Sequence, residues 1–291
     1  MLLFSQTVAR GSVDAKRENL IHIRSRRPTR FFDTCTLTHQ GTSRARILNK
    51  VNVMSFDTLF LLIIVLLLAV VFPLLGVRDH RILSRQISEG DTDARVKFYK
   101  GVLKFHWPLT IGLLAWWLLA GNSLESIGLV PVADGPQWVA IGVGALAIFA
   151  QVTYLAMVSR NADKLAVIKE KLGELSILAP QTRTENRLFD MVSITAGVCE
   201  EILYRGLLLA TLVSLVGTWP AVAISSLIFG LGHAYQGIFG IVKTGLVGLV
   251  LALLTVFSGS LFIAIVLHAV IDLTSGRIMG RALRMTTLQT A

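Results

Sequence analysis

Residues 58–76 (TLFLLIIVLLLAVVFPLLG) form an uncharged, almost entirely apolar run that is long enough to cross the hydrocarbon core of a bilayer. No strand pattern or internal repeat is visible elsewhere in the chain. Instead, more apolar stretches of helical character follow, at residues 107–121, 137–159, 188–217, 219–235, 237–258 and 259–275. We therefore predict an all-α fold, a polytopic membrane helix bundle of about seven transmembrane helices.

The composition agrees with a membrane protein. Hydrophobic residues make up 53% of the 291 residues and charged residues only 16%, whereas an ordinary soluble domain has about 25% charged residues. A disordered chain is excluded, and too little polar surface is left for a soluble enzyme. The net charge of +10 invites a nucleic-acid interpretation, but residues 1–53 hold ten basic residues against three acids, and residues 54–291 hold eighteen against fifteen. We expect the lipid bilayer, and no nucleic acid, as a partner.

The excess charge lies in a basic leader, residues 1–53, which has no long apolar core and is therefore not a secretory signal peptide. We favour an upstream extension of the reading frame, with Met54 as the true start. A disordered tail on anionic lipid and an organellar transit peptide are the alternatives. The remaining chain divides into N-terminal transmembrane helices and loops (54–187), a catalytic transmembrane core (188–275) and a basic cytoplasmic tail (276–291).

The basic loops predict an orientation. Residues 78–106 contain seven Lys or Arg and residues 160–187 contain six, whereas residues 122–136 contain none. By the positive-inside rule, the chain should begin outside near Met54 and end in the cytoplasm. Within the first basic loop, residues 95–107 mix basic and aromatic side chains, and we interpret them as an interfacial anchor without specific recognition.

Ionisable residues interrupt three of the predicted spans. Such groups are costly inside a membrane, so each should face protein or water and have a partner. In VCEEILYR, Glu201 and Arg205 are four residues apart and share a helix face, while Glu200 points about 100° away. Arg205 can thus neutralise Glu201 and leave Glu200 available as a general base. An ion-paired cluster that fixes helix packing is an equally good interpretation of this motif alone.

Two further motifs follow. His233 ends the sequence FGLGH, and by itself it is better interpreted as a helix-interface residue than as a catalyst. His268 and Asp272 in HAVID share a helix face, so the acid can fix the imidazole tautomer. All these groups could converge on one cavity open to the cytoplasm. A carboxylate with imidazoles in a wet cavity suits water activation and amide hydrolysis.

The three motifs, EEILYR, FGLGH and HAVID, occur in the order EExxxR, FxxxH and HxxxD. In this the chain resembles the CAAX protease and bacteriocin-processing (CPBP) family of intramembrane endopeptidases and is similar to its type II CAAX prenyl endopeptidases. The resemblance covers about residues 188–275; the earlier residues share only their hydrophobicity. It implies an integral membrane enzyme, expected in a bacterial plasma membrane, that acts on a peptide or protein substrate, prenylated or otherwise hydrophobic.

The resemblance also implies roles for the motif residues. Glu200 and His233 would polarise the attacking water, and His268 with Asp272 would stabilise the oxyanion or complete the site. Eukaryotic CAAX members carry Asn where this chain has Asp272. An ionised Asp repels an oxyanion, so we assign Asp272 the orientation of His268. Glu201 and Arg205 become a supporting ion pair.

Members of the family have been described both as metalloproteases and as metal-independent glutamic proteases. Glu200, His233 and His268 could bind zinc, but the chain lacks the HExxH pattern, so we expect no cofactor. Cys35 and Cys199 suggest neither a disulfide framework nor a thiolate metal site. Two other functions stay open: a non-catalytic protein for bacteriocin self-immunity or scaffolding, and, with less support, a proton-coupled transporter.

Overall fold

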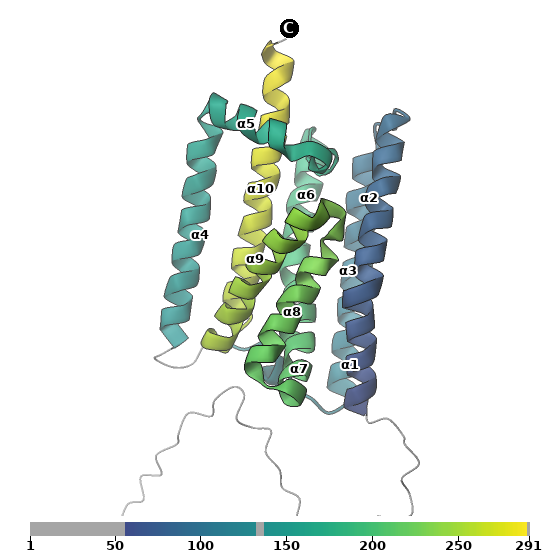
Figure 1. Ribbon diagram of the computed structural model, residues 1–291, viewed down its shortest axis with the longest axis vertical. Helices are drawn as coiled ribbons and strands as arrows, with labels where there is room; N and C mark the ends of the chain where they lie inside the picture. The colour runs from purple at the N-terminus through teal and green to yellow at the C-terminus, as the bar shows by residue number, and fades with distance from the viewer. Residues whose placement is uncertain (1–55, 132–136, 290–291) are drawn as a thin grey trace, which may run out of the picture.

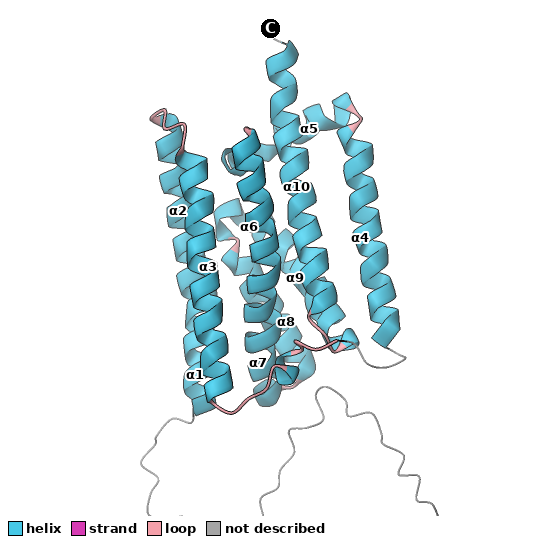
Figure 2. Cartoon of the chain, turned by 180° about the vertical axis from the view of Figure 1, so that it is seen from behind, coloured by secondary structure: helices cyan, strands magenta, loops and turns pink. Residues whose placement is uncertain are grey.

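The computed structural model describes residues 56–131 and 137–289. Within these ranges the chain is helical with no strand, which confirms the predicted all-α polytopic bundle (Figures 1 and 2). The basic leader and the proposed start at Met54 lie outside the described residues.

Seven helical segments make up the bundle in the described ranges, with a further short helix, α5, at one end (Figure 1). The first segment is continuous through a π-helical stretch, and so is the fourth. In chain order the segments are α1 Phe56–Leu66 with η1 Leu67–Val71 and α2 Phe72–Ser88; α3 Ala94–Leu119; α4 Gln137–Ser159; α6 Arg183–Glu201 with η4 Ile202–Leu208 and α7 Leu209–Val216; α8 Thr218–Gly232; α9 Gly237–Ser258; and α10 Phe262–Gln289. The connections contain α5 Ala162–Leu172 and the 3₁₀ turns η2 Glu125–Ile127, η3 Gly173–Leu178 and η5 Ala234–Gln236.

Five helices of the described chain are long and apolar enough to cross a membrane. This is fewer than the predicted seven. The two predicted spans that do not meet this criterion are the segments that carry the first two motifs. The segment α6–η4–α7 places Glu200, Glu201 and Arg205 within its apolar part, and α8 has only 15 residues. Charged residues thus lower the hydropathy of α6–η4–α7, whereas α8 is apolar but short.

Local sequence explains where α6 begins and where α7 and α9 end. At the start of α6, Thr182 accepts a hydrogen bond from the Glu185 amide, and the Glu185 side chain reaches back to the Thr182 amide, which is a capping box. Gly217 and Gly259 have φ of 81° and 66°, a backbone region that favours glycine. The chain therefore reverses sharply between α7 and α8 and between α9 and α10.

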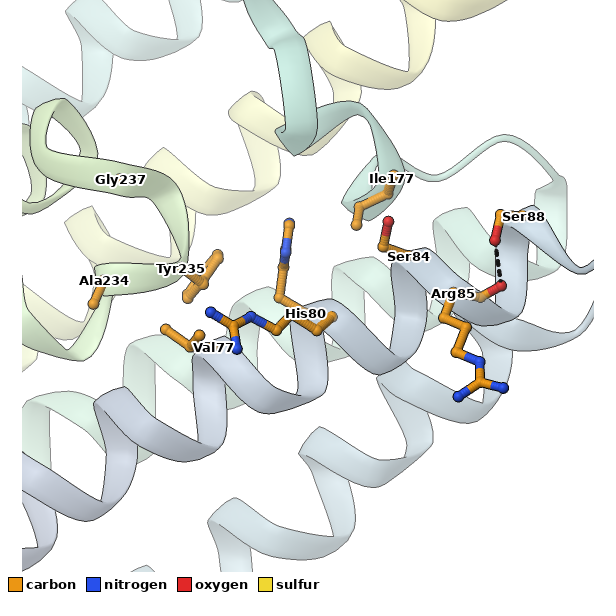
Figure 3. Close-up of a pocket in the computed structure, with 10 residues that line it drawn as sticks. Val77, His80, Ser84, Arg85, Ser88, Ile177, Ala234, Tyr235 and Gly237 are labelled. Carbon is orange, nitrogen blue, oxygen red and sulfur yellow. Dashed lines mark hydrogen bonds between the residues drawn. The ribbon is translucent and has the colours of Figure 1, made fainter.

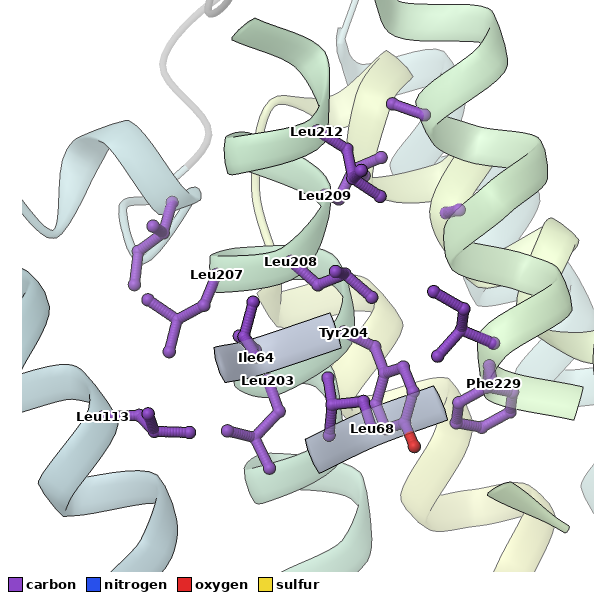
Figure 4. Packing of buried hydrophobic residues seen from close by; sticks show 14 of the residues in the cluster. Ile64, Leu68, Leu113, Leu203, Tyr204, Leu207, Leu208, Leu209, Leu212 and Phe229 are labelled. Atoms are coloured by element: carbon purple, nitrogen blue, oxygen red, sulfur yellow. The ribbon is translucent and has the colours of Figure 1, made fainter. Parts of the chain in front are cut away.

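The main apolar core surrounds η4 (Figure 4). Leu203, Leu207 and Leu208 are fully buried there, and the ring of Tyr204 packs edge-on against Phe229 of α8 with centroids 5.1 Å apart. The outside of the bundle is also apolar, since large side chains along α4 are exposed, among them Leu146, Phe149 and Met157. An apolar exterior around a packed interior is the pattern of an integral, multi-pass membrane protein.

Candidate active site

Three helices bring the motif residues together. Glu200 and Glu201 end α6, His233 caps the end of α8, and His268 and Asp272 lie on α10. Helices α6 and α10 can approach closely because α6 carries a glycine at the crossing. A Cβ on Gly197 would lie 2.9 Å from the Ala269 Cβ and 3.0 Å from the Ile265 carbonyl oxygen. The third motif packs on α6 through these contacts at Gly197. The second motif packs on the first through the ring of Phe229, which contacts Tyr204.

Glu201 is the centre of a buried ionic cluster. Arg205 Nη1 donates to Glu201 Oε1 at 2.8 Å, and both side chains are fully buried. His268 Nδ1 donates to the same oxygen at 2.7 Å. The Arg205 guanidinium also donates to the Gly248 carbonyl at 3.1 Å and lies 4.0 Å from the centroid of the Phe229 ring. The i,i+4 ion pair predicted from the sequence is therefore present, and its carboxylate also accepts a hydrogen bond from the His268 imidazole.

His268 Nδ1 donates to Glu201 the hydrogen bond that orients the ring, whereas the sequence predicts Asp272 as the orienting carboxylate. Asp272 does share a helix face with His268, but its Oδ2 lies 3.7 Å from Nε2, beyond hydrogen-bonding distance. The physical reason is that α6 supplies a better-placed carboxylate to the other ring nitrogen. Asp272 is left facing Nε2, with 38% of its side chain exposed.

Glu200 faces a different set of groups. Its carboxylate interacts electrostatically with His106, His233 and His268 and also with the Arg205 guanidinium, which donates its hydrogen bond to Glu201. The side chain is 15% exposed, so it is enclosed by protein without being sealed. The two neighbouring glutamates therefore differ as the helix geometry predicts: Arg205 neutralises Glu201, and imidazoles surround Glu200.

His106 on α3 is a site residue that the sequence interpretation missed. Its Nε2 lies 3.5 Å from Glu200 Oε1, and its Nδ1 lies 3.0 Å from the Val102 carbonyl oxygen. We had assigned residues 95–107 to an interfacial anchor, and the histidine was hidden among basic and aromatic neighbours. An available signal was that His106 is the one imidazole at the start of an apolar run, where an ionisable group needs a partner.

The hydrogen bonding of His233 determines which of its ring nitrogens carries the proton. Its Nδ1 lies 3.0 Å from the Phe229 carbonyl oxygen, which can only accept, so Nδ1 carries the proton. No described residue makes a hydrogen bond to Nε2, so in the neutral ring this atom has an available lone pair. The Phe229 ring contacts both motif histidines, with its centroid 5.0 Å from that of His233 and 5.7 Å from that of His268.

The zinc candidates do not fit a metal site as they lie. In the described part of the chain, no group of three His, Cys, Asp or Glu side chains is placed to hold a metal ion. His268 uses Nδ1 for Glu201, so only Nε2 of its ring is left to bind an ion.

The fold and the site define a class: a multi-pass membrane protein with an acid–imidazole centre inside its helix bundle. Comparison with known families makes this specific, because residues 187–274 match the model described as type II CAAX prenyl endopeptidase Rce1-like. This match over residues 187–274 supports a relationship with the CAAX protease and bacteriocin-processing family. Neither the curated proteins nor the solved structures contain a match.

Proposed function

We propose that this protein hydrolyses a peptide bond near the cytoplasmic face of the membrane, in CAAX-type processing of a lipidated or hydrophobic substrate. The observation that carries the proposal is that two adjacent glutamates have different partners. Arg205 forms a hydrogen-bonded ion pair with Glu201. Glu200 interacts with imidazoles, among them that of His233, whose Nε2 has no hydrogen bond to a described residue. Glu200 is thus the carboxylate available to accept a proton from water.

The chemistry follows from these positions. Glu200 and His233 Nε2 polarise one water; Glu200 accepts its proton as the oxygen attacks the carbonyl carbon. Protonated at Nε2, the His268 ring donates to the developing oxyanion, and the carboxylates of Glu201 and Asp272 flank its two nitrogens and balance its charge. The proton then passes to the leaving nitrogen as the carbon–nitrogen bond breaks, which releases a carboxylic acid and an amine.

The cytoplasmic assignment follows from the charges at one end of the bundle. His233 ends α8 at the same end as α5 and the C-terminal part of α10 (Figure 1). The two basic loops and Arg277, Arg281 and Arg284 also belong to that end. Basic loops favour the cytoplasmic side, so the site would open there.

The test is reconstitution of the purified protein with a library of prenylated and unmodified peptides. We expect Glu200→Gln to abolish cleavage, since it keeps the shape of the side chain and removes the base, and chelator to leave the wild-type rate unchanged. Glu125→Gln, an exposed glutamate in η2, is the matched control and should cleave normally. A folded, fully active Glu200→Gln variant would contradict the mechanism. Full biological effect of both Glu200→Gln and His233→Ala would instead favour the immunity or scaffolding function.

A further inference from the structure

Two cavities lie at the end of the bundle that carries α5 (Figure 1). The larger, of about 610 Å³, lies between α2, η3 and η5 and includes apolar lining residues such as Val77 and Ile177 (Figure 3). The smaller, of about 430 Å³, lies between the start of α6 and the C-terminal part of α10. We call it the arginine cleft, because its described lining is polar throughout and consists of Gln181, Arg183, Asn186, Arg187 and Arg284.

The three guanidinium groups of the arginine cleft are available to a ligand. Within the described ranges, neither Arg183 nor Arg187 makes an ion pair or a side-chain hydrogen bond. Arg284 donates to the Pro180 carbonyl at 3.3 Å, which brings α10 to the start of α6 and leaves its charge without an acid. Three such groups around one cavity, with no acid among the described residues that line it, indicate an anionic ligand.

The two acids in the first half of α6 have other partners and do not neutralise the cleft. Glu185 is buried and accepts hydrogen bonds from the backbone amides of Gln181 and Thr182 at 2.6 and 3.1 Å, so its carboxylate caps the helix. Asp190 lies 3.4 Å from Arg277 of α10 and forms an ion pair with it. The positive charge of the arginine cleft is therefore left for a group from outside the chain.

An exposed apolar stripe continues from the cleft along α6. Arg187, Met191 and Ile194 have the spacing i, i+4, i+7, so they share one face of the helix. Met191 and Ile194 are 53% and 51% exposed, although both side chains are large and apolar. A ligand that fits the cleft and the stripe together has an anionic head and an apolar tail.

We propose that the arginine cleft binds the phosphate of an anionic phospholipid, with an acyl chain along Met191 and Ile194. Guanidinium groups match phosphate oxygens in bidentate pairs, and basic pockets between transmembrane helices are known to bind acidic lipid headgroups. Because Arg284 belongs to α10 and the other two arginines belong to α6, one phosphate joins the two helices that carry Glu201 and His268. The lipid thus stabilises the packing of these helices, whether or not the protein cleaves a peptide.

The first experiment measures lipid binding to the purified full chain in detergent by native mass spectrometry. We expect phosphatidylglycerol to bind at least about tenfold more tightly than phosphatidylcholine, the scale of one charge-assisted hydrogen bond. The double variant Arg187→Gln/Arg284→Gln should lose this preference, and Arg187→Lys/Arg284→Lys should keep part of it. The control is Arg160→Gln/Arg281→Gln, which removes the same charge from exposed positions outside the cleft. Equal wild-type affinity for the two lipids, or an equal loss in the control, would overturn the proposal.

Thermal unfolding distinguishes a bound lipid from a free anion. At 100 times its Kd, phosphatidylglycerol should raise the Tm of the wild type by about 5 °C and leave that of Arg187→Gln/Arg284→Gln unchanged. Inorganic phosphate and glycerol 3-phosphate at the same concentration should have no effect, because they have no acyl chain to cover the stripe. Ile194→Ser should weaken binding of phosphatidylglycerol for the same reason. Equal stabilisation by inorganic phosphate would assign the cleft to a free anion and contradict the lipid site.

Discussion

At the residue scale, the contact between His106 and Glu200 has a consequence for proton transfer. The Val102 carbonyl accepts from Nδ1, so in a neutral ring Nε2 presents a lone pair to the Glu200 oxygen 3.5 Å away. An ionised Glu200 beside that lone pair would be repelled. A proton that Glu200 takes from water removes this repulsion, because it can lie between the carboxylate and His106 Nε2. His106 is thus placed to hold the proton that Glu200 takes from water.

We predict that replacing His106 lowers kcat about 100-fold and leaves KM within about twofold, a loss within the range for general acid–base groups. His106→Gln and His106→Leu should be equally impaired, because glutamine keeps a hydrogen-bond donor but cannot exchange a proton. Steady-state kinetics with the peptide that the wild type cleaves best would measure this. Lys104→Gln, exposed on the same helix, is the control. If His106→Gln retained normal kcat, His106 would be only a spacer that positions Glu200.

The sequence anticipated contacts along one helix better than contacts between helices. The Glu201–Arg205 pair could be predicted because positions i and i+4 meet on any helix. The same spacing placed Asp272 beside His268, yet it could not reveal that Glu201, 67 residues earlier, reaches the other ring nitrogen. His106 was missed for the same reason, since only the packing of α3 against α6 brings it to Glu200.

At the scale of elements, the sequence again predicts local structure better than features that depend on packing between helices. The apolar runs predicted every helix of the bundle, because each run must satisfy its backbone internally in lipid. They did not predict the π-helical stretch Ile202–Leu208, which begins directly after Glu201 and is fully buried. π-helical turns occur often at functional sites. This one carries Arg205 and turns three leucines into the core beside the cluster.

The crossing of α6 and α10 determines whether Glu201 reaches His268, and Gly197 sets that crossing. We predict that Gly197→Ala lowers the free energy of unfolding by about 1–3 kcal/mol, the usual cost of overpacking, because the added Cβ would meet backbone atoms of Ile265 and Ala269. Cleavage should fall further than stability, since the Glu201–His268 hydrogen bond lengthens. Thermal unfolding in detergent and cleavage assays at a temperature where both proteins are folded would measure the two effects.

Gly142→Ala on α4 is the matched control for Gly197→Ala. A Cβ at Gly142 has no neighbour within 4 Å, so this variant should be as stable and as active as the wild type. If Gly197→Ala matched it in both measurements, the helices would tolerate separation and the close crossing would not position the site.

At the scale of the whole molecule, charge and helix direction give one consistent topology. Successive segments alternate in direction between the two ends of the bundle (Figure 1). Between residue 92, before α3, and residue 125, after it, the chain runs once from one end of the bundle to the other; from there to residue 281 on α10 it runs between the ends five more times. Residues 92 and 281 therefore lie toward one end of the bundle and residue 125 toward the other.

We predict that an impermeant maleimide applied to intact cells labels Glu125→Cys, and labels Thr92→Cys and Arg281→Cys only after lysis. The background carries Cys35→Ser, and the buried Cys199 should stay unreactive. This pattern follows from the positive-inside rule, because the basic loops belong to the same end as residues 92 and 281. The reverse pattern would keep the bundle and place the site outside the cell, contrary to the proposed function. Labelling of Thr92→Cys and Glu125→Cys from the same side would show that α3 does not cross, and His106 could not then meet Glu200 inside the membrane.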